Sequence, residues 1–108
     1  MIEKILEALC SADEMALSRC FAEDGKLYDY CPCVNGGEAH IVYGRDGIEL
    51  LYRSLFAVRR VTAAEPLADG EDTGTFFGSY DGPYVYARVT VTERDADGLV
   101  RRAVIAPA

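Results

Sequence analysis

The chain has no tryptophan, one histidine and no long uninterrupted apolar segment. No run approaches the roughly 18 apolar residues of a membrane-spanning helix, and the N-terminus is too acidic for a secretory signal. Basic residues are also scarce, because 11 Lys and Arg face 18 Asp and Glu, for a net charge of −7. Such a chain repels phosphate backbones. We therefore expect a cytoplasmic protein that binds neither nucleic acid nor membranes.

The four cysteines are expected to be free thiols in that reducing compartment. Cys31 and Cys33 together with His40 suggest a zinc site, since thiolate and imidazole are good zinc ligands. However, two ligands two residues apart on one strand bind a metal awkwardly, and a fourth ligand is not evident. The C-x-x-C spacing of a redox pair is absent. We therefore predict neither a metal nor a cofactor.

With 108 residues, half of them hydrophobic, the chain suits a single domain over residues 1–108. Apolar spacing predicts helices over 2–10, 12–22 and 48–56, and a capping box would start the second helix at Ser11 and Glu14. Alternating residues and turn signals predict strands over 26–34, 38–43, 58–67, 74–80, 84–94 and 99–106. This order indicates an α+β fold with helices packed on one side of a curved, mainly antiparallel sheet.

The polar segment after the second helix contains the best candidates for chemistry. Asn35-Gly36 predicts a tight turn, which would place Cys31 opposite His40 and Asp29 opposite Val42. A three-residue turn that includes Gly37 would shift this register. Because side chains alternate, one face would carry Asp29, Cys31, Cys33 and His40. The other face would carry Tyr28, Tyr30, Ile41 and Tyr43.

Three stretches carry a family resemblance: FAEDGKLYD, YGRDGIELLYRSLF and VTVTERDADGLVRRAVI. Together with the element order they resemble the nuclear transport factor 2-like (NTF2-like) superfamily, which includes ketosteroid isomerase and the SnoaL-like polyketide cyclases. The resemblance implies a cone-shaped fold whose open end is a ligand pocket. This fold hosts enzymes, binding domains and assembly modules, so function has to be argued from the site.

The resemblance places Asp29 at the position of the isomerase's general base. It also places Ile5 and Thr90 where that enzyme has its two oxyanion-hole donors, so ketosteroid isomerisation is not expected. A pocket-facing Asp29 would have a raised pKa, and His40 on the same face could share the proton. The expected reaction is that of a lyase, isomerase or cyclase. In the alternative interpretation, Asp29 is a hydrogen-bonded strand residue and His40 a half-exposed one.

A small apolar or aromatic metabolite is the expected ligand. The candidate ligand-binding residues are Tyr43, Tyr52, Tyr86, Arg88 and Thr90. The resemblance turns the Thr90 face of strand 84–94 toward the pocket, whereas burial of its valines would turn the opposite face toward the helices. Both can hold if the second face is buried in a homodimer formed through the sheet. The alternative function is therefore a non-catalytic module for dimerisation or partner docking.

Overall fold

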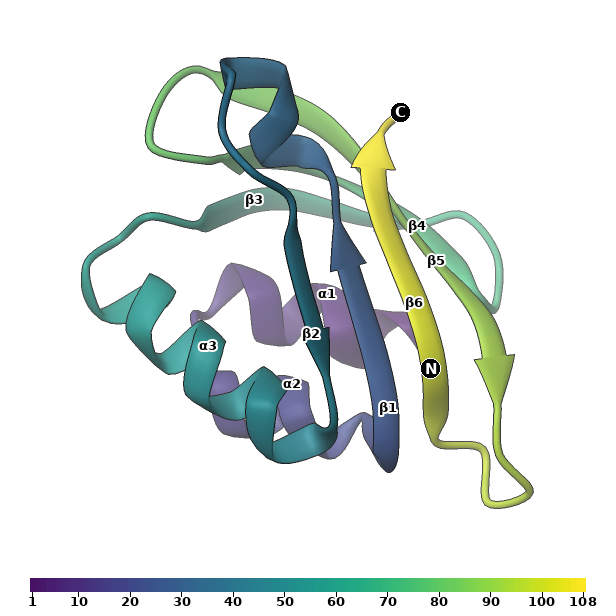
Figure 1. Ribbon diagram of the computed structural model, residues 1–108. Helices are drawn as coiled ribbons and strands as arrows, with labels where there is room; N and C mark the ends of the chain where they lie inside the picture. The colour runs from purple at the N-terminus through teal and green to yellow at the C-terminus, as the bar shows by residue number, and fades with distance from the viewer.

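Three helices cover one face of a six-stranded sheet, as Figure 1 shows. The structure is a computed structural model that describes residues 1–108. Its elements in chain order are α1 (Ile2–Cys10), α2 (Glu14–Arg19), β1 (Phe21–Asp29), the 3₁₀ helix η1 (Cys31–Asn35), β2 (His40–Tyr43), α3 (Arg45–Ala57), β3 (Thr62–Ala68), β4 (Thr73–Ser79), β5 (Tyr84–Arg94) and β6 (Val100–Pro107). The predicted α+β class is confirmed. No helix is both long and apolar enough to cross a membrane.

The sheet is mixed and curves around the helices (Figure 1). Its strand order is β2-β1-β6-β5-β4-β3, so the first strand of the chain lies beside the last. These two strands run parallel, and every other neighbouring pair is antiparallel. The β1–β6 pairing therefore joins the hairpin of β1 and β2 to the meander of β3 to β6.

In β5, the face that points toward the helices is the one whose apolar residues were predicted to be buried there. Its buried side chains are Val85, Ala87, Val89 and Val91. Tyr86, Arg88 and Thr90 consequently lie on the outer face of the sheet, which no helix covers. The resemblance-based expectation that this second set faces the pocket is wrong. Apolar burial decides the orientation, because four small and medium aliphatic side chains gain most from leaving water.

The start of the chain differs from the prediction at two points. Asp13, and not Ser11, caps α2, because its side chain accepts a hydrogen bond from the Ala16 N–H at 3.0 Å. The helix ends at Arg19, and β1 begins at Phe21, which is fully buried. Gly25 does not terminate a helix. It allows close contact between strands, because a Cβ there would lie 2.8 Å from the Val100 carbonyl oxygen.

The segment after Asp29 does not continue as a strand. Residues 31–35 form η1 instead, with Pro32 in its first turn and Gly36 ending it at a φ of 79°. The predicted register is therefore wrong by two residues, since Asp29 pairs with His40 and Leu27 with Val42. A two-residue shift preserves the alternation of faces. Asp29 and His40 share the inner face, as predicted, and are direct cross-strand neighbours.

Candidate functional site

The carboxyl group of Asp29 is buried at the end of β1, with 1% of the residue exposed. Its Oδ1 atom accepts a hydrogen bond from the Cys31 N–H at 3.0 Å, because η1 turns the backbone back over the strand end. The Oδ2 atom has no partner. Burial raises the pKa of Asp29 to about 6, and the Cys31 N–H and the nearby Tyr80 hydroxyl limit that rise. The carboxyl group is therefore poised to titrate near neutral pH.

Three further polar side chains surround this carboxyl group and form with it the Asp29 cluster (Asp29, Cys31, Tyr52 and Tyr80). Tyr52 comes from α3 and Tyr80 follows β4; both are buried, and neither hydroxyl has a hydrogen-bond partner. The Tyr80 hydroxyl lies near Asp29 but outside hydrogen-bond geometry. Burial, reinforced by the Asp29 charge, raises the pKa of both tyrosines and brings the pKa of Cys31 to about 12. These three groups therefore remain protonated.

His40 lies between the Asp29 cluster and the surface. Its ring centre lies 6.4 Å from that of Tyr80, and its Nδ1 atom is buried without a partner. Burial, and to a smaller extent the Arg60 charge, lowers the pKa of His40. The imidazole is consequently neutral at pH 7 and can accept a proton or a hydrogen bond. No hydrogen bond joins its side chain to Asp29.

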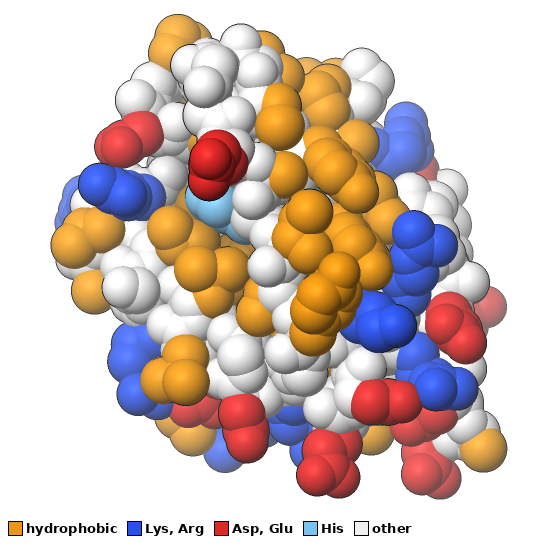
Figure 2. Space-filling model, viewed as in Figure 1, with side chains coloured by type: hydrophobic (Ala, Val, Ile, Leu, Met, Phe, Trp, Pro, Cys, Tyr) orange, Lys and Arg blue, Asp and Glu red, His pale blue; other side chains and the backbone are white.

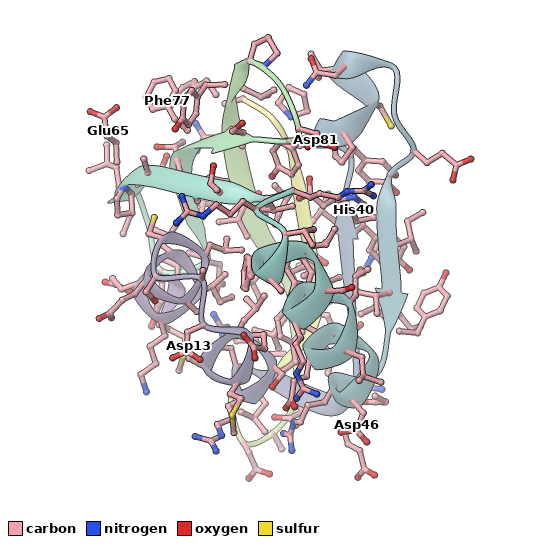
Figure 3. All side chains as sticks on the ribbon, turned by 90° about the vertical axis from the view of Figure 1, so that its left-hand side faces the viewer. Asp13, His40, Asp46, Glu65, Phe77 and Asp81 are labelled. Carbon is pink, nitrogen blue, oxygen red and sulfur yellow. The ribbon has the colours of Figure 1, made fainter.

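A cavity of about 460 Å³ opens beside His40. We call it the His40 cavity; its lining residues are Pro32, Asn35, Gly37, Glu38, Ala39, His40, Arg60, Tyr80 and Asp81. Figure 2 shows the histidine inside a hollow of the surface. In Figure 3, His40 and Asp81 lie near each other, at the end of the molecule opposite Asp13 and Asp46. Asp29 does not line the cavity, but its neighbours His40 and Tyr80 do.

The predicted ligand-binding residues do not form one set. Tyr52 belongs to the Asp29 cluster, whereas Tyr43, Tyr86, Arg88 and Thr90 lie on the outer sheet face. Tyr43 is 63% exposed, and Arg88 forms an ion pair with Asp69. None of these four side chains lines the His40 cavity. The structure therefore does not bring these four candidate residues together with Asp29.

Two residues of the site were missed from the sequence. Tyr80 could have been found by alternation, because Phe76 and Gly78 precede it on the buried face of β4. Arg60 lies in the turn between α3 and β3, where no pattern predicts its direction. The two cysteines that were considered as zinc ligands lie in different surroundings, since Cys31 is buried and Cys33 exposed. No three His, Cys, Asp or Glu side chains come together as a possible metal site.

Comparison with known proteins identifies the fold. No family model and no curated protein matches the chain. A solved protein of unknown function with a cystatin-like fold from Methylobium petroleophilum is 19% identical, with a TM-score of 0.68 over 99% of this chain and 72% of that one. A SnoaL-like protein from Burkholderia thailandensis is 16% identical, with a TM-score of 0.63 over 98% of this chain and 89% of that one.

A third solved structure is of a protein from Catenulispora acidiphila with a ketosteroid isomerase-like fold, in complex with trimethylamine. It is 16% identical, with a TM-score of 0.64 over 99% of this chain and 84% of that one. Other similar structures are described as NTF2-like. At these identities the likeness establishes the fold, and the expected NTF2-like cone fold is confirmed.

Proposed function

We propose that this NTF2-like cone binds a small molecule in the His40 cavity and exchanges a proton with it through the Asp29 cluster. One observation carries this proposal. A buried carboxyl group, with one oxygen unpartnered and a pKa of about 6, lies directly behind His40 and Tyr80, and these two residues line an open cavity. Buried ionisable groups beside a cavity are typical of sites for proton transfer.

The protonation states assign a role to each group. Asp29, with its pKa of about 6, is largely ionised at pH 7 and remains basic enough to accept a proton. A pKa near the working pH favours general-base catalysis. His40 is neutral and reaches the cavity, so it can take the proton from the ligand and share it with Asp29 across the strand pair. Tyr80 keeps its proton, and its ring lines the cavity beside His40 while its hydroxyl lies near the Asp29 carboxyl group.

A lyase, isomerase or cyclase reaction suits these groups, because each needs a proton removed at one atom and delivered to another. The cavity offers an apolar surface at Pro32 and Ala39 and aromatic rings at His40 and Tyr80. The remaining lining residues are mostly polar. We therefore propose a small ligand with an apolar or aromatic body and a polar substituent that lies among the polar lining residues.

The first experiment is an NMR titration of the Asp29 carboxyl carbon in the wild type and in His40→Ala. We expect a pKa near 6 in the wild type, and a changed value in the variant because removing the ring admits water. His40→Gln is the control, since glutamine keeps most of the volume of the histidine side chain but cannot be protonated at these pH values. An Asp29 pKa near 4 that does not respond to His40 would remove the basis for proton transfer.

A second candidate function, dimerisation through the sheet, is favoured by the outer sheet face. Figure 2 shows a broad hydrophobic area on this side of the molecule. Aromatic side chains of the outer sheet face make local pairs, with 6.4 Å between the ring centres of Tyr28 and Tyr30 and 4.9 Å between those of Phe77 and Tyr86. Exposed apolar areas of this kind commonly mark interfaces, and tyrosine is enriched in them.

Light scattering after size-exclusion chromatography tests this candidate. We expect twice the chain mass of 11.8 kDa for the wild type, and the single mass for Tyr28→Glu combined with Tyr86→Glu. Val58→Glu is the matched control, because Val58 is 65% exposed just after α3 and lies away from the sheet face. A monomeric wild type at high concentration would exclude a homodimer.

A further inference from the structure

The charges that line the His40 cavity are unequal. Glu38 and Asp81 are acidic, and Arg60 is the single permanent cation. Arg60 already forms an ion pair with Asp81, with 3.7 Å between the Arg60 Nε and the Asp81 Oδ2. No ion pair or hydrogen bond engages the Glu38 carboxylate. With Asp29 behind the wall, the cavity has an excess of negative charge.

The polar atoms around the cavity also include several without partners. The Tyr80 hydroxyl and the Asp29 Oδ2 atom are unpartnered, in residues that are only 5% and 1% exposed. The Nδ1 atom of His40 is also buried and unpartnered. Because the imidazole is neutral at pH 7, it offers a lone pair rather than a charge. The Asp29 carboxylate does not line the cavity but adds negative charge behind its wall, next to His40 and Tyr80.

The apolar part of the lining is suited to the body of such a cation. The rings of His40 and Tyr80 provide aromatic surface, and a cation close to an aromatic ring is attracted by its negative face. Pro32 and Ala39 provide aliphatic contacts. An anion, in contrast, would find one cation that Asp81 already engages and would approach the free carboxylate of Glu38.

We infer that the His40 cavity selects a small organic amine in its protonated form over neutral or anionic molecules of the same shape. This inference rests on the proposed small-molecule site and specifies its ligand class. The ammonium group lies near Glu38, and the apolar body contacts Pro32 and the ring of Tyr80. The negative potential of the cavity supplies the selectivity, because like-charged ligands are repelled.

The experiment compares three probes that share a benzyl framework: benzylamine, benzyl alcohol and benzoate. Binding at pH 7 is followed by the chemical shifts of the His40 ring protons, which report the cavity directly because the chain has one histidine. We expect benzylamine to bind about threefold more tightly than benzyl alcohol, because the Glu38 carboxylate is exposed and water weakens its attraction for an ammonium. Benzoate should bind most weakly.

Variants separate the charge effect from the shape of the cavity. Glu38→Gln should abolish most of the preference for benzylamine and leave the affinity for benzyl alcohol unchanged. Arg60→Gln should strengthen benzylamine binding, because it removes the opposing charge. Glu71→Gln is the matched control, since Glu71 is exposed and does not line the cavity, and it should change nothing.

The outcomes distinguish the two proposals. If benzyl alcohol shifts the His40 signals with an affinity equal to that of benzylamine, the amine class is wrong while the small-molecule site stands. If benzoate binds most tightly and Arg60→Gln abolishes it, the site prefers anions and the inference is overturned. If no probe shifts His40, both the amine class and the proposed site are refuted.

Discussion

Replacing Asp29 with asparagine should make the folded chain more stable at neutral pH. The carboxyl group is buried, and burial raises its pKa from the ordinary 3.8 to about 6. The folded chain therefore binds a proton more tightly than the unfolded chain does. An amide of the same shape carries no charge to desolvate, and its oxygen can still accept the hydrogen bond from the Cys31 N–H.

The pH dependence follows from the sign of this shift. Below about pH 4 the carboxyl group is mostly protonated in both states, and the contribution of Asp29 to the free energy of unfolding is highest. As the pH rises from about 4 to 6, the unfolded chain loses its proton first and the wild type becomes less stable. Above pH 6 the loss is complete and amounts to about 3 kcal/mol, at 1.36 kcal/mol for each pH unit between the two values.

Urea denaturation followed by circular dichroism, at intervals between pH 4 and pH 8, measures this difference. Asp29→Asn should match the wild type near pH 4 and exceed its stability by up to about 3 kcal/mol at pH 7. Asp97→Asn is the matched control, because Asp97 is exposed and its side chain engages no partner, so the pH dependence should stay that of the wild type. A variant with no advantage at pH 7 would show that Asp29 is not desolvated.

Three further substitutions or modifications test the packing around the site. Tyr52→Phe removes a fully buried hydroxyl that has no partner and should raise the free energy of unfolding by about 1 kcal/mol in the same urea assay; a loss would reveal a hidden hydrogen bond. Gly25→Ala should lower it by about 1–3 kcal/mol, because the added methyl meets the Val100 carbonyl oxygen at 2.8 Å. Iodoacetamide should alkylate exposed Cys33 well before Cys31, which is buried with a pKa of about 12. Both cysteines lie in the tryptic peptide 27–45, so its fragmentation by tandem mass spectrometry locates the adduct, and early alkylation of Cys31 would contradict this prediction.

Local patterns in the sequence were sufficient to predict much of the fold. The apolar stripe of α3 and the alternation of β5 each specify which face is buried, because the spacing of side chains follows directly from helix and strand geometry. The same alternation placed Asp29 and His40 on one face even though the predicted register was wrong. A shift of two residues changes the partners but not the faces.

Other local features were decided by distant contacts. Phe21 continues the helical spacing of α2, yet it lies in β1 because the strand pairs with β6 near Val100. Pairing with a strand almost 80 residues away buries this ring completely, and no pattern within a short window reports that gain. Residues 31–35 likewise form η1 because the chain turns over the end of the sheet, which the turn residues alone do not specify.

The sequence by itself determined the class of the fold and the candidate pair Asp29 and His40. Only the tertiary structure brought Tyr52, Tyr80 and Arg60 to that pair, from three separate parts of the chain. Only burial among these neighbours gives the carboxyl group its pKa of about 6, because desolvation depends on all the atoms that replace water around it. The orientation of the sheet was decided in the same way, since the helices can cover one face and leave the tyrosines on the other.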